Sequence, residues 1–345
     1  MHEMRNIEMN LCYQTYDILT SHHRQEKILQ VGPVESDGFL VVESDVESEF
    51  GGSIVEIALN KRTYLAIFKQ AHDYWHDCRS QFKSIETQST DKLWDLYKVT
   101  VSYLLTTNDH HYIVGIHENI LTELYNRGEP ILDTELEIIS TLISSKMRKV
   151  NKNSLLWHLM KKLTTINGTV DEITIYRIFK SCQYHPCNYY ASEFLIWLVR
   201  VRRLLGQDNE LIEQLLVKSC RSDLSDVSLW ITLKQYLQIN NEVVISDYNV
   251  MVDDVNSKFK SHISHLVAKQ HLEDHSHLIS TQLNWLFTIK CQNETPYISL
   301  VDYTKELMIQ QISKETQQLD KLDKSGVLYS DQIDYIRILT KVSRR

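Results

Sequence analysis

The stretch Tyr184–Ala191 (YHPCNYYA) decides the fold, because it joins two segments that both have helical periodicity. Before it, from about Thr169 to Gln183, isoleucine and phenylalanine side chains recur three and four positions apart. After it, apolar residues recur in the same way through Tyr189–Leu205. This pattern predicts a helical hairpin with Pro186 in its turn, where a proline interrupts no helix.

The hairpin is one unit of a series. Val114, Trp157, Ser192 and Trp230 occupy equivalent positions in the second helices, and the period is roughly 35 to 43 residues. Such a period is typical of helical solenoids. The helix pairs that we expect are 92–106 with 112–125, 134–149 with 154–165, 169–183 with 189–205, 209–221 with 228–239, and 275–288 with 297–311.

Composition favours the same fold class, because 9 Gly and 4 Pro among 345 residues are too few for an all-β protein. We expect an all-α superhelix, a solenoid of helical hairpins, with an irregular N-terminal segment at 1–52 and a repeat domain at 53–345. Short strands are expected around 39–42, a first long helix over 54–82, and a polar stretch over 240–258. Two Thr-x-x-Glu sequences, Thr134 with Glu137 and Thr169 with Glu172, predict capping boxes.

Charge and hydropathy limit the function. The chain has 37 Lys and Arg against 45 Asp and Glu, a net charge of -8, which disfavours nucleic-acid binding. Its apolar runs are shorter than the roughly 20 residues that span a bilayer, and its six cysteines have no paired spacing. We therefore expect a cytoplasmic protein with reduced thiols.

The sequence predicts no catalytic residue and no metal ligand on this chain. His72 and His76 have the i,i+4 spacing of metal ligands, but no glutamate stands between them as in HExxH. A histidine-rich stretch at 262–277 is more simply a solvated polar face. Glycine-rich phosphate loops and the Gly-x-Ser-x-Gly elbow are both absent from the sequence.

The second helices resemble the protein prenyltransferase α-subunit repeat, whose core is Asn-Tyr-x-Ala-Trp-x-x-Arg. Asn188, Tyr189 and Tyr190, followed by alanine, match its opening, and Trp197 lies in the apolar continuation. The resemblance covers roughly residues 38 to 345 and is greatest for the divergent branch of prenyltransferase α-subunit repeat-containing proteins, which includes a fungal form.

The other hairpins keep parts of this motif. Trp157 retains the tryptophan, Lys161 supplies a basic residue one position late, and His117 replaces the arginine. Cys187 stands where farnesyltransferase α subunits place a diphosphate-binding lysine, and a neutral thiol cannot replace that charge. The resemblance therefore implies a subunit with a mainly architectural role.

What the resemblance implies is an α-type subunit of a heterodimeric protein geranylgeranyltransferase of the type III kind. Its implied partners are the Rab geranylgeranyltransferase β subunit, which would hold zinc and geranylgeranyl diphosphate, and a protein substrate of the SNARE type. Asn188, Tyr189 and Tyr190 would lie near the partner or the mouth of its active site. Read without the resemblance, Asn188 is a helix cap and Tyr189 a packing aromatic.

The eroded tryptophan and arginine positions favour an alternative from another class. In that interpretation the chain is a non-enzymatic α-solenoid scaffold or adaptor that has lost prenyltransferase function. A self-contained enzyme is disfavoured, because the sequence shows no complete set of nucleophile, acid, base or metal ligands.

Overall fold

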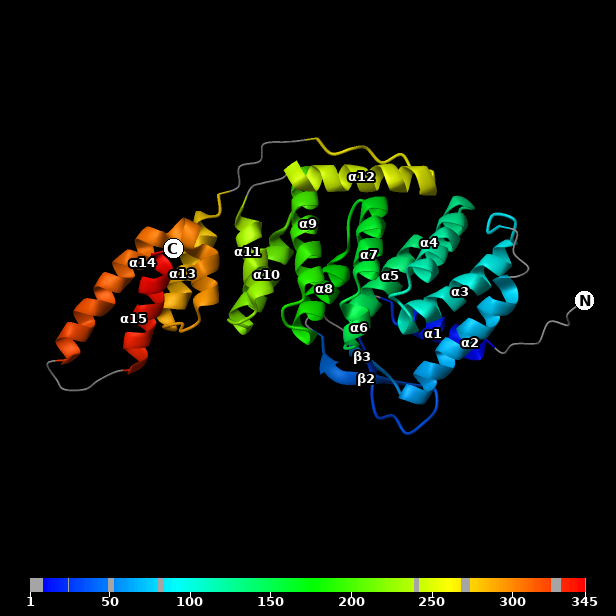
Figure 1. Ribbon diagram of the computed structural model, residues 1–345, viewed down its shortest axis with the longest axis horizontal. Helices are drawn as coiled ribbons and strands as arrows, with labels where there is room; N and C mark the ends of the chain where they lie inside the picture. The colour runs from blue at the N-terminus through cyan, green and yellow to red at the C-terminus, as the bar shows by residue number, and fades with distance from the viewer. Residues whose placement is uncertain are drawn as a thin grey trace, which may run out of the picture.

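The computed structural model describes residues 9–23, 25–48, 53–79, 84–238, 242–267, 274–323 and 330–344. Within these residues the chain is an array of helical hairpins with one small sheet near its N-terminus (Figure 1). The predicted fold class, an all-α solenoid, is confirmed.

The N-terminal region contains more regular structure than its sequence suggested. Helix α1 (Asn10–Thr20) is followed by strands β1 (Glu26–Val31), β2 (Phe39–Glu47) and β3 (Ser53–Leu59), and then by α2 (Lys61–Arg79). The central strand β3 pairs in parallel with β1 and antiparallel with β2. The strand expected around 39–42 is present, and the sheet straddles the boundary expected between residues 52 and 53.

The expectation of a helix from residue 54 is wrong over 54–59, which form β3. Val55, Ile57 and Leu59 are fully buried, so the apolar residues alternate as in a strand with one covered face. A short apolar run fits both helical and strand periodicity. Residues 54–59 form a strand because they pair with β1 on one side and with β2 on the other.

Four helical hairpins follow, close to the predicted positions. Their first helices are α3, α5, α8 and α10, their second helices are α4, α7, α9 and α11, and the short α6 lies between α5 and α7. The bounds are α3 (Thr90–Thr106), α4 (His111–Asn126), α5 (Leu132–Ile143), α6 (Arg148–Asn151), α7 (Ser154–Asn167), α8 (Glu172–Tyr184), α9 (Tyr189–Leu205), α10 (Glu210–Ser222) and α11 (Val227–Leu237).

Both predicted capping boxes are wrong. Glu137 lies inside α5, where it accepts hydrogen bonds from Lys27 and Arg177. Helix α8 is capped by Asp171, whose side chain accepts a hydrogen bond from the Thr174 amide at 2.9 Å. An aspartate at the N-cap satisfies the same free amides as the predicted threonine would.

The stretch expected to be polar over 240–258 contains helix α12 (Glu242–Phe259), which lies across the second helices α4, α7 and α9 (Figure 1). Helices α13 (Ser276–Thr288), α14 (Glu294–Asp323) and α15 (Ser330–Ser343) complete the chain. Their bundle packs on α11 through α14, where Lys234 pairs with Asp302 at 2.7 Å.

The buried apolar side chains form one continuous core that extends from α1 to α15. Trp157, Trp197 and Trp230 are buried within it. In the described residues, no helix combines the length and the apolar character that crossing a membrane requires.

Candidate functional site: a groove between α7, α9 and α12

Helix α12 presents three faces to its surroundings. The first is apolar and packs on α4, α7 and α9, and its buried residues are Val244, Tyr248, Met251, Val252, Val255 and Phe259. Burying six such side chains stabilises the docked helix by on the order of 10 kcal/mol as an upper bound. Helix α12 is therefore packed on the array as one of its own helices.

Charged side chains complete the attachment of α12. Lys162 of α7 pairs with Glu118 of α4 at 2.5 Å and with Asp254 of α12 at 2.8 Å. Lys258 of α12 pairs with the same two carboxylates at 2.9 and 3.0 Å. Burial opposes ionisation of Glu118 and Asp254, but the two lysines outweigh it and lower the pKa of both carboxyl groups. We call Lys162, Lys258, Glu118 and Asp254 the α12 charge network.

A groove of about 530 Å³ remains beside this network. Its walls come from α7, α9 and a second face of α12, and its lining residues are His158, Lys161, Lys162, Trp197, Asp247, Val250, Met251 and Asp254. A volume of this size is typical of a site for one or two side chains or a small ligand. We call it the α12 groove.

The floor of the α12 groove is apolar and aromatic. Val250 is 67% exposed, an unusual position for valine, and Met251 and Trp197 are buried beside it. The indole N–H of Trp197 is buried and has no hydrogen-bond partner among the residues that the structure describes. An unmet donor of this kind costs about 1–3 kcal/mol, so it is expected at few positions in a native fold.

The charged side chains at the rim differ in whether they already have a partner of opposite charge. Lys161 lies over the Trp197 ring, 5.7 Å from its centroid, and pairs with Glu193 at 3.3 Å. Lys162 is held by the α12 charge network. Asp247 is exposed and forms no ion pair or hydrogen bond with the residues that the structure describes. The carboxylate of Asp247 is therefore the charge most available to a ligand.

His158 stands at the α7 wall of the groove. Burial, followed by the nearby Lys162 charge, lowers the pKa of its imidazole. Within the described part of the chain His158 makes no hydrogen bond, so no second group orients its ring.

The structure places two of the sequence-predicted motif residues, Lys161 and Trp197, in this groove. Trp157 lies behind it, with its ring 5.5 Å from that of Phe194, which in turn lies 5.6 Å from Trp197. These rings are core packing between adjacent hairpins.

His117 belongs to a separate, fully buried network. Its Nε2 lies 2.9 Å from Glu135 Oε1, its Nδ1 lies 2.8 Å from Thr100 Oγ1, and Tyr97 donates a hydrogen bond to Glu135. A hydroxyl, an imidazole and a carboxylate in a row are the parts of a nucleophile triad. All four side chains are inaccessible to solvent, so the network can only support the fold.

Asn188 and its neighbours lie at the α8–α9 turn, outside the groove. Asn188 is 1% exposed, caps α9 through the Ala191 amide, and donates hydrogen bonds to Asn151 at 2.6 Å and Ser181 at 3.0 Å. The interpretation of Asn188 as a helix cap is confirmed. The Asn-Tyr-x-Ala match therefore reflects a common way to begin a helix.

Tyr189 and Cys187 are exposed at this turn, whereas Tyr190 packs against the core. Tyr189 is 66% exposed, Tyr190 is partly buried, and their rings meet edge to face at 5.8 Å. The exposure contradicts the interpretation of Tyr189 as a packing aromatic. Cys187 is exposed at a positive φ of 56°, and its amide donates to Asp226 at 2.9 Å.

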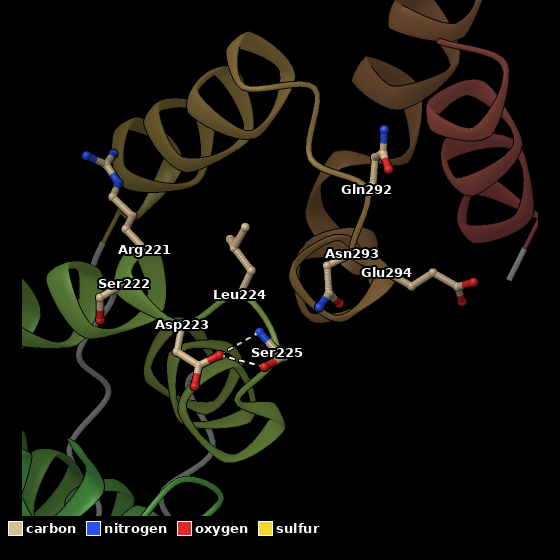
Figure 2. A pocket seen from close by; sticks show the side chains of 8 residues that line it. All are labelled: Arg221, Ser222, Asp223, Leu224, Ser225, Gln292, Asn293 and Glu294. Carbon is tan, nitrogen blue, oxygen red and sulfur yellow. Dashed lines mark hydrogen bonds between the residues drawn. The ribbon is translucent and has the colours of Figure 1, made fainter. Parts of the chain in front are cut away.

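A larger cavity of about 730 Å³ lies between the α10–α11 turn and the residues before α14 (Figure 2). Its charged groups are already engaged: Asp223 accepts from the Ser225 amide and hydroxyl at 2.9 and 2.7 Å, as the dashed lines in Figure 2 show. Arg221 donates to Gln282 at 3.0 Å, and Glu294 pairs with Lys341 at 2.6 Å. This open cleft offers a ligand little that the chain does not already use.

No group of three or more His, Cys, Asp or Glu side chains is arranged to hold a metal ion among the described residues. His72 and His76 are exposed, and their rings stack at 6.2 Å.

The sequence analysis missed six of the groove residues: His158 and Lys162 on α7, and Asp247, Val250, Met251 and Asp254 on α12. The apolar positions of α12 recur three and four residues apart, as on an amphipathic helix. That signal could have identified the helix, although five acidic and amide side chains between the apolar ones gave the stretch its polar character.

Comparison with known proteins overturns the prenyltransferase resemblance. Residues 5–144 match the family described as the ECM9 N-terminal domain, and residues 156–259 match the ECM9 middle domain. The first match runs from before α1 to the end of α5, and the second ends with α12 and contains the whole α12 groove.

The chain is also similar to Protein ECM9 of Saccharomyces cerevisiae, with 24% identity over 265 residues that cover 73% of this chain and 67% of the yeast protein. No solved structure matches the chain.

The prediction of a geranylgeranyltransferase subunit is therefore wrong, and so is the ancestry assumed for a scaffold that has lost prenyltransferase function. The residues that carried the prenyltransferase resemblance have structural roles that occur in helical hairpins of any family. Examples are the helix cap at Asn188 and the ring packing at Trp157. The zinc, geranylgeranyl diphosphate, β subunit and SNARE expectations stay untested predictions that had no basis except that resemblance. Over residues 5–144 and 156–259 the chain is similar to the ECM9 proteins, and ECM9 is the family that the comparisons support.

Proposed function

We propose that this chain is a protein-binding helical scaffold that holds a short segment of a partner protein in the α12 groove. The observation that carries the proposal is the combination of an exposed apolar floor at Val250 with the carboxylate of Asp247, which has no ion-pair partner in the described part of the chain. These two features fit a segment that places an aliphatic side chain beside a lysine or an arginine.

The apolar part of the recognition follows from Val250, Met251 and Trp197. Covering an exposed valine and the adjoining ring edge removes apolar surface from water, which stabilises a complex by roughly 25 cal/mol per Å². A ligand carbonyl at the α9 wall would also give the Trp197 indole the acceptor that it lacks among the described residues.

The charged part follows from the rim. The two lysines of the groove each have a carboxylate partner, whereas Asp247 has none among the described residues. The chain also carries a net charge of -8, which favours the approach of a basic segment. An acidic ligand would have to compete with Glu193, Glu118 and Asp254 for the same lysines.

The test begins with selection of peptides from a random displayed library on the purified full chain. The tightest peptide is then synthesised with a fluorescent label, and its Kd is measured by anisotropy. We expect selected peptides to carry a lysine or arginine within two residues of an aliphatic side chain. The substitutions Asp247→Lys and Val250→Glu should each weaken binding by about tenfold or more, since each replaces an attraction by a repulsion or a desolvated charge.

A matched control is available on the same helix. Asp253 is an exposed aspartate on another face of α12, where it lies 2.8 Å from His265. The substitution Asp253→Lys should leave the Kd within about twofold of the unsubstituted value. The proposal would be overturned if neither Asp247→Lys nor Val250→Glu changed the Kd of the selected peptide. It would also be overturned if Asp253→Lys weakened binding as much as they do.

A further inference from the structure

The third face of α12 holds an extended segment of the chain itself. After Phe259 the chain reverses direction at Lys260, whose φ of 48° lies in the left-handed region that lysine rarely adopts. Residues 260–267 then run back along α12 without forming regular secondary structure.

Two asparagines of α12 hold the main chain of this segment. Asn256 accepts a hydrogen bond from the Ile263 amide at 2.9 Å and donates one to the Ile263 carbonyl at 2.8 Å. Asn249 does the same with Leu266, at 2.8 and 3.0 Å. Each side-chain amide thus binds both polar groups of one residue, as a neighbouring β-strand would.

The spacing of the two asparagines fits an extended chain. Seven residues separate Asn249 from Asn256, which is about 10.5 Å along an α-helix. Three residues separate Ile263 from Leu266, which is about 9–10 Å in an extended or polyproline II conformation. The two spacings are nearly equal. Helix α12 can therefore bind the main chain of another extended segment, provided that its side chains fit.

Side chains add a limited amount of affinity. Leu266 is buried and Ile263 is partly buried against the core, whereas Val267 is 73% exposed. Four hydrogen bonds at a net 0.5–1.5 kcal/mol each give the contact about 2–6 kcal/mol before the cost of ordering the segment. Together with the buried Leu266 and the 2.8 Å contact of His265 with Asp253, these bonds make a smaller contact than that of α12, which buries six apolar side chains.

The match to the ECM9 middle domain includes the two asparagines but not the segment that they bind. Asn249 and Asn256 lie inside the range that matches the ECM9 middle domain, and that match ends at residue 259. The segment 260–267 lies beyond it. The asparagine face is thus part of the domain, while the segment that fills it here follows the domain.

We propose that the Asn249/Asn256 face of α12 is a binding site for an extended segment of a partner protein, and that residues 260–267 occupy it as an internal competitor. The partner segment carries two aliphatic residues three positions apart, as Ile263 and Leu266 are, and its main chain accepts the two asparagine clamps. Because the internal segment is tethered at an effective concentration on the order of millimolar, it lowers the apparent affinity for the partner.

The probe is a labelled peptide with the sequence of residues 260–267, and the protein is the full chain in which residues 261–267 are replaced by glycine and serine. We expect the peptide to bind this segment-replaced chain and to bind the unsubstituted chain at least tenfold more weakly. Adding Asn249→Ala and Asn256→Ala to the segment-replaced chain should abolish binding, while adding Ser257→Ala, an exposed position on the same helix, should not. Circular dichroism and the Tm confirm that each variant is folded.

Hydrogen exchange gives a second readout on the unsubstituted chain. Asn256→Ala should speed exchange of the Ile263 amide, whose acceptor it removes, and leave the amides inside α12 unchanged. Failure of the peptide to bind a folded segment-replaced chain would overturn the proposal. The proposal would also be overturned if a peptide with alanine in place of Ile263 and Leu266 bound with the same Kd. Formation of a dimer of the segment-replaced chain, in place of a peptide complex, would overturn it too.

Discussion

Two charge networks attach the parts outside the hairpins to the array, and they differ in how much water they meet. In the first, Lys27 of β1 and Arg177 of α8 both lie 2.7 Å from Glu137 of α5. The second is the α12 charge network, in which Asp254 and Lys258 are more than one third exposed. The buried network fixes the N-terminal sheet on the hairpins and offers nothing to a ligand, whereas the open one borders the α12 groove.

The difference shows in how each charge is satisfied. Arg177 also donates to the Ser140 hydroxyl at 2.8 Å and to the Gln25 carbonyl at 2.7 Å, and Lys27 donates to the Leu19 carbonyl at 2.6 Å. Burial alone would raise the pKa of Glu137, but Arg177 and Lys27 together lower it to about 2. Burial lowers the pKa of Lys27 to about 8 in spite of Glu137. The buried network is stable only as a whole.

The largest effect should follow from Glu137→Ala. This change leaves Lys27 and Arg177 buried without their carboxylate, and breaking a buried pair in this way costs about 3–5 kcal/mol. Urea unfolding followed by circular dichroism measures the loss. Glu193→Ala is the control, because Glu193 is half exposed and its removal should change the free energy of unfolding by less than about 0.5 kcal/mol. Equal losses in the two variants would show that burial of the carboxylate does not decide the cost of removing it.

An acid titration sharpens the same comparison. Because the pKa of Glu137 is lower in the folded chain than in the unfolded one, its contribution is present above about pH 5 and is lost as pH falls toward 2. We expect Glu137→Gln to remove about 2–3 kcal/mol of the decrease in unfolding free energy over this interval. Urea unfolding at a series of pH values tests this, with Glu193→Gln as the variant that should keep the full slope. Parallel curves for the two variants would contradict the assignment to Glu137.

Local sequence signals predicted the hairpins and failed at the elements that cross them. Pro186 in a turn, the helix cap at Asn188 and the recurring tryptophans each act within one hairpin or between neighbours, so their pattern is visible along the chain. The sheet depends on β1 pairing with β3 across more than twenty residues, and no local pattern encodes such a pairing. The identification with prenyltransferases failed for a related reason, since a degenerate repeat motif records how hairpins pack and says little about what they bind.

The candidate site was predictable only on one side. Lys161 and Trp197 were singled out as positions of the repeat motif in the second helices, but the opposing wall comes from α12, more than forty residues further along the chain. Glu137 was read as half of a capping box, although Lys27 and Arg177, its partners, are far from it in sequence. Ion pairs between segments that are distant in sequence produce no repeating sequence pattern. Both networks could therefore be identified only from the three-dimensional structure.

The smallest effect, and the most direct comparison with Glu137→Ala, should follow from Lys162→Ala. Lys162 is as buried as Glu137, and it contacts two carboxylates, Glu118 and Asp254. Both carboxylates keep Lys258 as a second partner at 2.9 and 3.0 Å, and Asp254 is open to water. The remaining charges are therefore still neutralised and solvated, and we expect a loss of about 1–2 kcal/mol in urea unfolding, well below that of Glu137→Ala.

Lys161→Ala, which removes the neighbouring lysine whose carboxylate partner is half exposed, should cost less than about 0.5 kcal/mol and serves as the control. A loss of about 4 kcal/mol or more in Lys162→Ala would show that the α12 charge network depends on every member, as the buried one does. The groove would then be bordered by a structural cluster, and ligand contact would have to rely on Asp247 and Val250 alone. A small loss, with α12 still docked, instead means that water and Lys258 replace Lys162, so the rim of the groove can exchange partners without loosening the array.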